Sequence, residues 1–242
     1  MRTLLGVAHG TRSAVGQAQL RELMDQVACR RPDLDVRLAY VDVQQPRVAE
    51  ALRPGAVLVP LLLSTGYHVR VDIADAVAGT DARVTAPLGP DPVLTEVLAE
   101  RLPAATDAVV LAAAGSSEAR WQAEVGAVAA SLNAHVAYAS GGGPRVPDVV
   151  AGLRRAGAGH VTVATYLLAD GLFYRSLHRA GADEVTAPLI TSPVIADLVL
   201  SRYLKTGRDL EAGRHLTTAG VRLTEEMNGC VTAGGRAGNR GP

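Results

Sequence analysis

Short runs of apolar residues alternate along the chain with longer segments that have helical spacing. In the first half these runs cover residues 3–8, 36–41, 56–63 and 83–86. The segments between them repeat apolar residues three or four positions apart, as in Leu20, Leu23, Met24 and Val27 and again in Val69, Ile73, Ala76 and Val77. Strands that alternate with helices predict an α/β fold with parallel, doubly wound sheets.

The same pattern occurs twice. VTAPLGPDPVLTEVL from Val84 recurs as VTAPLITSPVIADLV from Val185, with seven identities in fifteen positions. AYVDVQQPRV from Ala39 pairs with AYASGGGPRV from Ala137, and LLLSTGYHVR from Leu61 pairs with YLLADGLFYR from Tyr166. The offsets of 101, 98 and 105 residues imply only small insertions. The repeat therefore predicts two tandem domains of one topology.

The domain boundaries follow from the repeat. We expect a first domain at 1–103, a second, degenerate repeat at 104–205, and an extension at 206–242. In both domains the last helix has a predicted start, because Asp91-Pro92 and Ser192-Pro193 each place a capping residue before a proline. The end of the extension, AGGRAGNRGP, has the composition of a disordered tail.

Composition narrows the class of function. Apolar residues make up 48% of the chain and aromatic residues only 3%, which is typical of buried parallel strands built from aliphatic side chains. Lys+Arg and Asp+Glu balance at 24 each, so nothing global indicates a nucleic-acid or membrane partner. The two cysteines form no CxxC pair, and we find no signal peptide or apolar run long enough to span a membrane. We therefore expect a cytoplasmic protein.

Three potential metal ligands follow strands of the first domain. His9 follows the first apolar run, Asp42 follows the second, and His68 follows the third in the sequence STGYHVR. Because ligands of open α/β sheets bind at the carboxyl ends of the strands, these residues are expected at one edge. Two imidazoles and a carboxylate suit a borderline divalent ion such as Fe²⁺, Co²⁺, Ni²⁺ or Zn²⁺, whereas Mg²⁺ or Ca²⁺ prefers oxygen.

The repeat provides an internal control for these ligands. At the equivalent positions of the repeat, the second domain has Ala114 in place of His9, Ser140 in place of Asp42 and Phe173 in place of His68. The fold itself therefore does not demand the three residues, which favours a functional role for the histidines. For Asp42 a turn or helix-capping role stays open, because aspartate is common in such positions.

Residues near the histidines are candidates for substrate contacts. Gly10, Gly66 and Tyr67 lie in loops whose backbone N–H groups can face an anion, although small loop residues occur without any ligand. Arg12 and Arg70 follow the histidines closely and can each hold a carboxylate with two hydrogen bonds, or can be solvated surface residues.

At these residues the sequence resembles the class II chelatases, and within them the long-form sirohydrochlorin chelatases. The resemblance rests on HGTR at 9–12, YVDVQQPRVAEAL at 40–52 and VPLLLSTGYHVRVDI at 59–73. It implies two flavodoxin-like domains that face each other across a central cleft, with His9 and His68 as the metal-binding and catalytic pair. Relatives commonly have a glutamate at the position of Asp42, where it helps to handle the metal.

The resemblance also implies a reaction. A divalent metal ion, Co²⁺ or Fe²⁺ with Ni²⁺ as a further candidate, is inserted into sirohydrochlorin, as in cobalamin or sirohaem biosynthesis. No cofactor beyond the substrate metal is required. Neutral His9 or His68 can deliver the metal and accept a proton from the tetrapyrrole.

Other interpretations stay open. A two-lobed protein that binds a metal or metallo-tetrapyrrole for delivery, without chemistry, would show the same coarse pattern. A phosphate-transfer reading of HGTR, with His9 as nucleophile, is disfavoured because no arginine immediately precedes His9. The internal duplication makes a monomer plausible, and a homodimer stays open.

Overall fold

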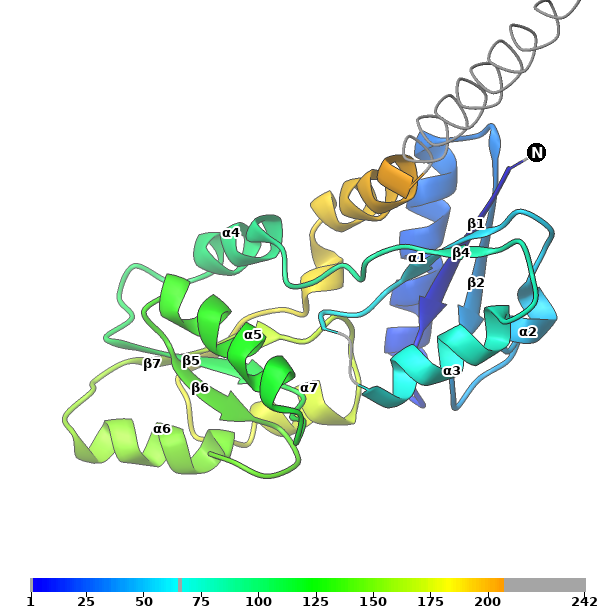
Figure 1. Cartoon of the computed structure of the whole chain (residues 1–242). Helices are drawn as coiled ribbons and strands as arrows, with labels where there is room; N and C mark the ends of the chain where they lie inside the picture. The colour runs from blue at the N-terminus through cyan, green and yellow to red at the C-terminus, as the bar shows by residue number, and fades with distance from the viewer. Residues whose placement is uncertain (1, 65–66, 207–242) are drawn as a thin grey trace, which may run out of the picture. The chain divides into compact units, whose positions relative to one another are not determined.

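Two parallel sheets form the framework of the chain (Figure 1). The computed structural model describes residues 2–64 and 67–206, with the backbone alone for residues 67–70. The first sheet has the strand order β2-β1-β3-β4, and the second has the equivalent order β6-β5-β7-β8. All pairs are parallel. The predicted α/β fold with two tandem, doubly wound sheets is confirmed.

The elements follow the predicted alternation. The first half contains β1 (Arg2–Ala8), α1 (Ala14–Arg30), β2 (Leu34–Tyr40), α2 (Val48–Ala51), β3 (Val57–Pro60), α3 (Tyr67–Val77), β4 (Arg83–Val84) and α4 (Pro92–Glu100). The second half contains β5 (Ala108–Ala113), α5 (Ala119–Ser131), β6 (His135–Tyr138), α6 (Val146–Arg155), β7 (Val161–Tyr166), α7 (Leu172–Leu177), β8 (Glu184–Val185), a 3-10 turn at Leu189–Thr191 and a helix at 194–206. The third apolar run, 56–63, is longer than β3 because the carbonyl of Leu62 accepts from Gly89 N–H instead of extending the sheet.

Each sheet is buried on both faces. In β1, Leu4 faces a core that also contains Leu111 of β5, so this core is shared by the two sheets. Leu5 of β1 faces an outer core of the first half. Val110 of β5 faces a separate outer core of the second half. The shared core is therefore the apolar contact that joins the halves.

The last helix of each half packs on the other half. By sequence α4 belongs to the first half, yet it contacts β7, and its Leu94 and Leu98 are fully buried in the shared core. The helix at 194–206 lies beside α1 (Figure 1), where Asp197 forms an ion pair with Arg30 at 2.9 Å. The two halves are thus held together by exchanged helices.

Two partly buried arginines reinforce this exchange. Arg202, in the last helix, forms an ion pair of 2.7 Å with Asp91 at the start of α4, and both side chains are only 16% exposed. Arg202 also donates to the carbonyl of Pro87 at 2.8 Å. At the other end of α4, Arg101 donates to the carbonyls of Ala187 and Pro188 at 2.7 and 3.0 Å. Because these bonds satisfy groups that packing removes from water, they fix how the halves meet.

One of the two predicted helix starts is confirmed. Asp91 caps α4 by accepting from Val93 N–H at 3.0 Å, with Pro92 in the first turn. Ser192 instead ends the 3-10 turn, and its hydroxyl makes no hydrogen bond with the described residues. The last helix begins two residues later, at 194.

The chain divides into compact units at Met1–Tyr203 and Leu204–Pro242, and both sheets lie in the first unit. The boundary expected between 103 and 104 stays a prediction. The expected disordered tail lies outside the described residues. Over the described ranges, no helix combines the length and the apolar character needed to cross a membrane.

Because the shared core joins the halves, a cavity in the first sheet should weaken the second half. We expect Leu4→Ala to lower the free energy of unfolding by about 2–5 kcal/mol. The measurement is urea unfolding followed by the fluorescence of Trp121, the chain's single tryptophan, which lies in the same core on α5. Glu22→Ala, on the exposed side of α1, is the control and should change the value by less than about 0.5 kcal/mol. An unchanged Trp121 transition in Leu4→Ala would show that the halves unfold separately.

Candidate metal site

The loops after β1 and β2 lie side by side at the carboxyl edge of the first sheet. Ala8 pairs with Tyr40 at the ends of these strands. The pairing continues into the loops, because Asp42 N–H donates to the carbonyl of His9 at 2.9 Å. The structure therefore brings together two of the three predicted ligands, His9 and Asp42.

The imidazole of His9 is open to solvent. His9 is exposed, and its ring makes no hydrogen bond within the described part of the chain. Its ring nitrogens are therefore accessible to a metal ion.

Asp42 carries a negative charge beside His9. Its carboxylate accepts from Val43 N–H at 2.7 Å and lies 3.3 Å from the guanidinium of Arg47. These hydrogen bonds, with a smaller contribution from the nearby charges of Arg47 and His9, hold the pKa of Asp42 below its usual value. The side chain is still 64% exposed, so the carboxylate can also reach a cation. Asp42 thus has the turn role considered for it and does not cap a helix, since α2 has Arg47 as its N-cap, and the turn leaves the carboxylate accessible.

Val43 has a strained backbone. Its φ is 67°, and Gln44 N–H donates across it to the carbonyl of Asp42 at 2.7 Å, as in a γ-turn of positive φ. A β-branched residue in this conformation costs about 1–3 kcal/mol. The repeat places Gly141 at the same position with a φ of 77°, where glycine removes the strain. The first half therefore keeps an unfavourable valine, 39% exposed, directly beside Asp42.

His68 is the second residue of α3, the helix that follows β3. Because β3 pairs with β1, the backbone places the start of this segment at the same sheet edge as His9. The side chains of Tyr67, His68 and Arg70 lie outside the described residues, and so does Gly66. Among the residues that are described, no cluster of three metal-ligating side chains occurs. The pairing of His68 with His9 stays a prediction.

Gly10 has a role in backbone packing, whereas Arg12 has an exposed side chain. Gly10 has a φ of 104°, and a Cβ there would lie 2.3 Å from the carbonyl of Asp42. Gly115 makes the same close approach to Ser140 in the second half, so packing of the two loops already explains this glycine. Arg12 is exposed and has no ion pair within the described ranges, which leaves its guanidinium available for a carboxylate. Their contacts with substrate remain predictions.

Two arginines at matching positions of the repeat, Arg47 and Arg145, have structural roles. Arg47 donates to the carbonyl of Val41, and Arg145 donates to the carbonyl of Ala139, each at 2.6 Å. Each bond ties the loop after a strand to the start of the next helix.

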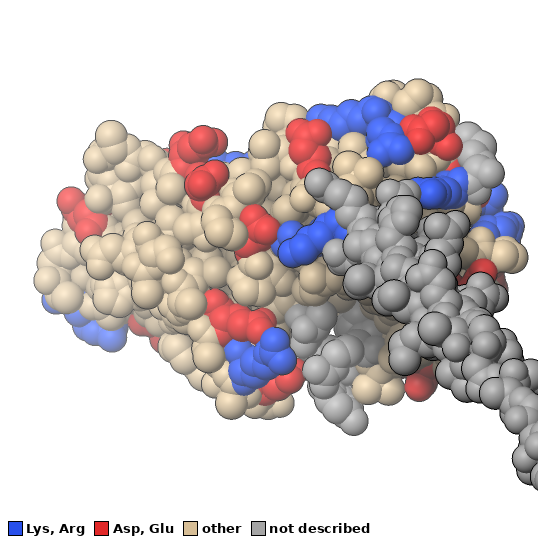
Figure 2. Space-filling view, turned by 45° about the horizontal axis from the view of Figure 1, so that its top comes forward, with Lys and Arg blue, Asp and Glu red and all other residues tan. Residues whose placement is uncertain are grey.

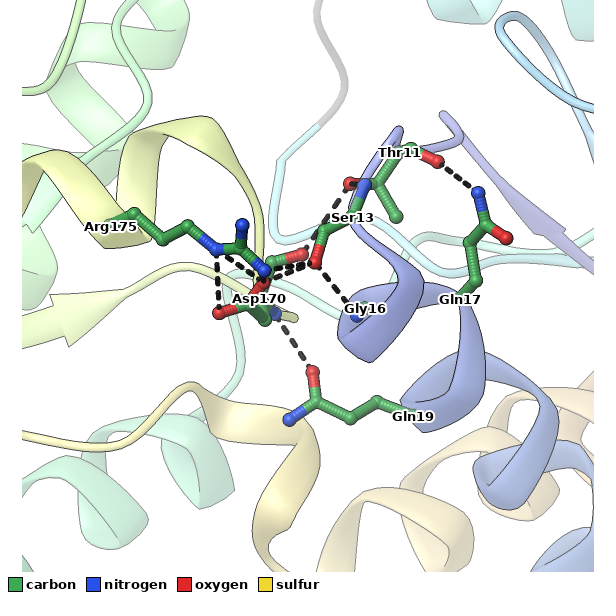
Figure 3. A network of polar contacts seen from close by, with 7 residues as sticks. All are labelled: Thr11, Ser13, Gly16, Gln17, Gln19, Asp170 and Arg175. Carbon is green, nitrogen blue, oxygen red and sulfur yellow. Dashed lines mark hydrogen bonds and ion pairs between the residues drawn. The ribbon is translucent and has the colours of Figure 1, made fainter.

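A polar network from the second half reaches the His9 loop (Figure 3). Ser13 caps α1, with its Oγ accepting from Gly16 N–H at 3.2 Å. The same hydroxyl donates to the carboxylate of Asp170 and accepts from Arg175 at 2.9 Å. Sequence reasoning missed Ser13 and Asp170. The serine before the apolar spacing of α1 is a readable capping signal, whereas no local pattern pairs residues 157 positions apart.

An open pocket of about 470 Å³ adjoins the Asp42 loop. Its lining consists of Gln17, Arg21, Leu38, Tyr40, Gln44, Gln45 and Pro46. Gln44 also accepts from Thr11 N–H at 2.9 Å, which ties the pocket wall to the His9 loop. Burial raises the pKa of Tyr40, and nearby Arg21 opposes this shift. The guanidinium of Arg21 and the side-chain amides of three glutamines therefore line a pocket that adjoins the candidate ligands.

Charge is distributed locally. On the face shown in Figure 2, acidic and basic residues are interspersed and neither sign forms a continuous field. With no net charge on the chain, attraction for an anionic or cationic ligand depends on individual groups such as Arg12 and Asp42.

Comparison with known proteins gives a family and a fold. The family model CbiX matches residues 3–105 and again 108–206. The structure of SirB from Bacillus subtilis with Fe³⁺ is similar with a TM-score of 0.72 and 19% identity, over 87% of this chain and 97% of that chain. SirB from Bacillus subtilis subspecies spizizenii in complex with cobalt has a TM-score of 0.63 and 19% identity, over the same shares.

A third structure, of CbiX as the terminal enzyme for siroheme biosynthesis in denitrifying bacteria, has a TM-score of 0.63 and 22% identity, over 84% of this chain and 98% of that chain. No curated protein sequence matches this chain. At these identities the structural similarities establish a common fold.

The strain at Val43 can be tested by exchange with its counterpart. We expect Val43→Gly to raise the free energy of unfolding by about 1 kcal/mol, because glycine adopts positive φ without steric cost. The matched variant Gly141→Val has ordinary room for its Cβ, whose nearest neighbour lies 3.8 Å away, so the strain of a φ of 77° alone should destabilise the protein. Both values come from urea unfolding. A loss of stability in Val43→Gly would contradict the strain.

Proposed function

The chain belongs to the CbiX family, and on that premise we propose that it inserts Co²⁺ or Fe²⁺ into sirohydrochlorin. The observation that carries the proposal is the exposed His9 imidazole, which makes no hydrogen bond with the residues that the structure describes, next to the Asp42 carboxylate. Of the similar structures, one is described with Fe³⁺, one with cobalt, and one as an enzyme of siroheme biosynthesis.

In this proposal the metal ion is bound by His9, His68 and Asp42. Two imidazoles and one carboxylate suit borderline divalent ions and leave coordination positions free for exchange. The Asp42 carboxylate, whose pKa is lowered by its hydrogen bonds to Val43 and Arg47, is negatively charged and attracts the cation. Such an incomplete ligand set releases its metal more readily than a closed site does.

Insertion exchanges one metal ion for two protons. The M²⁺ ion enters the ring, and the two pyrrole N–H protons leave, so the tetrapyrrole loses as much positive charge as the metal brings. The imidazoles of His9 and His68 are the protein groups that can accept these protons, and solvent takes up any proton that they do not. In this proposal Arg12 and Arg70 bind ring carboxylates, with backbone contacts from Gly10, Gly66 and Tyr67. No cofactor other than the substrate metal takes part.

The setting proposed for this chemistry is the cytoplasm. Cys29 is an exposed free thiol, which suits a reducing compartment. One chain supplies both sheets, so a monomer can hold the complete site.

The histidines are tested by substitution. We expect His9→Ala and His68→Ala each to lower the rate of Co²⁺ insertion into sirohydrochlorin by at least about 100-fold, the range expected for losing a positioned proton acceptor. Insertion is followed by absorbance in single-turnover reactions with Co²⁺, Fe²⁺ and Ni²⁺. His135→Ala, an exposed histidine of β6, is the matched control and should retain full activity. Undiminished turnover in both site variants would refute the assignment. Stoichiometric binding of metallated tetrapyrrole without turnover by the wild type would indicate a delivery protein instead.

Asp42 is tested separately. Asp42→Asn removes the charge and keeps an oxygen that can accept from Val43 N–H, so the loop should keep its conformation. We expect the KM for Co²⁺ to rise about tenfold, as for the loss of about 1.4 kcal/mol of attraction to the cation, with the KM for the tetrapyrrole unchanged. An equal rise in both KM values would mean that the loop had moved.

A further inference from the structure

The second half lacks counterparts of His9 and His68, yet it contacts the segments that carry them in the first half. We infer that Asp170 and Tyr166 are positioning residues, which hold the His9 loop and the segment leading to His68 in the orientation that metal insertion requires. This inference rests on the proposed function.

Asp170 is fixed on several sides. Its carboxylate accepts from the hydroxyl of Ser13 and forms an ion pair with Arg175 at 2.9 Å (Figure 3). Its backbone N–H donates to Gln19 of α1 at 2.8 Å. The Asp170 side chain is only 12% exposed, which partly shields its bond with Ser13 from water, whereas its partner Arg175 is 54% exposed.

The two backbones meet closely at this point. A Cβ on Gly16 would lie 2.1 Å from the carbonyl of Asp170, so only glycine allows the approach. Thr11 lies in the same contact, since a Cβ on Gly171 would be 3.3 Å from its hydroxyl. Thr11 is two residues from His9, and its N–H is held by Gln44 of the Asp42 loop. Displacement of Asp170 would therefore be transmitted to both candidate ligands.

The contact is asymmetric. By the repeat, Asp170 corresponds to Thr65, Ser13 to Glu118 and Gly16 to Trp121, so the reverse contact cannot form with the same groups. Trp121 instead packs in the shared core against Tyr138, with ring centroids 5.6 Å apart. The scaffold itself does not require the Asp170 network, which is built only toward the half that carries the histidines.

Tyr166 makes the second contact. Its hydroxyl donates to the carbonyl of Leu63 at 3.0 Å, in the segment between β3 and α3. The tyrosine is 3% exposed, and burial raises the pKa of its hydroxyl far above its usual value, so it stays a donor. Its counterpart in the first half is Leu61, which has no hydroxyl. The end of β7 therefore supports the chain that leads into α3 and His68.

The test separates positioning from stability. We expect Asp170→Ala to lower kcat per folded molecule about 10- to 100-fold, the range for a displaced reacting group, with the tetrapyrrole KM changed less than about threefold. Asp170→Asn should restore most of kcat, because its Oδ1 can accept from both Ser13 and Arg175. Tyr166→Phe, which removes only the hydroxyl, should also lower kcat without raising the tetrapyrrole KM.

Arg30→Gln is the matched control. It breaks the ion pair with Asp197, which also joins the halves through α1 but lies at the opposite end of that helix. It should lower the unfolding midpoint and leave kcat per folded molecule within about twofold of wild type. An equal loss of kcat in Arg30→Gln, or no loss in both Asp170→Ala and Tyr166→Phe, would overturn the inference.

Hydrogen exchange provides a readout that does not depend on activity. In Asp170→Ala the amides of residues 10–16 should exchange faster than in wild type, since Gly16 N–H is bonded to the Ser13 hydroxyl that Asp170 holds. Arg30→Gln should leave these amides unchanged. If the wild type inserts no metal, the proposed function fails, and unchanged exchange in Asp170→Ala would refute the positioning contact independently.

Discussion

The shared apolar core between the two sheets is the contact on which the rest of the structure depends. Leu4 of β1 and Leu111 of β5 face it from opposite sheets, and the exchanged helices, α4 and 194–206, close it. Since a packed core allows few relative orientations, this contact fixes where the carboxyl edge of one sheet lies against the other half. Contacts such as that of Asp170 with Ser13 are possible only because the core has set this arrangement first.

The two halves share a scaffold but differ in the side chains that follow their strands. Both halves keep the devices that shape the loops, such as the close approach at Gly10 and Gly115. They differ where a ligand would bind: the first half has exposed His9 and Asp42, and the second has Asp170 and Tyr166 turned toward the first. The first half therefore carries exposed side chains at this sheet edge, and the second half carries groups that bond to the adjoining loops of the first.

A strained backbone and two exposed polar side chains lie close together at the candidate site. Val43 keeps a strained φ, His9 has an imidazole without a hydrogen bond to described residues, and Asp42 holds an accessible charge. The strain at Val43 costs free energy, which burial elsewhere compensates, above all in the shared core, whereas the hydrogen bonds of Asp42 stabilise its loop. A strained backbone and accessible polar side chains at one sheet edge are features expected of a binding site.

The sequence by itself determined the elements, the repeat and the placement of His9 and Asp42 at one sheet edge. Those features follow from local periodicity and from the rule that parallel strands end at the same edge. The domain boundary and the geometry of His68 stay predictions. Only the tertiary structure decided that α4 and the last helix are exchanged. The sequence pattern of an apolar helix face does not depend on which sheet the helix covers. The tertiary structure also decided the pairing of Ser13 with Asp170, since a contact between residues so distant in sequence depends on how the cores pack and leaves no local signal.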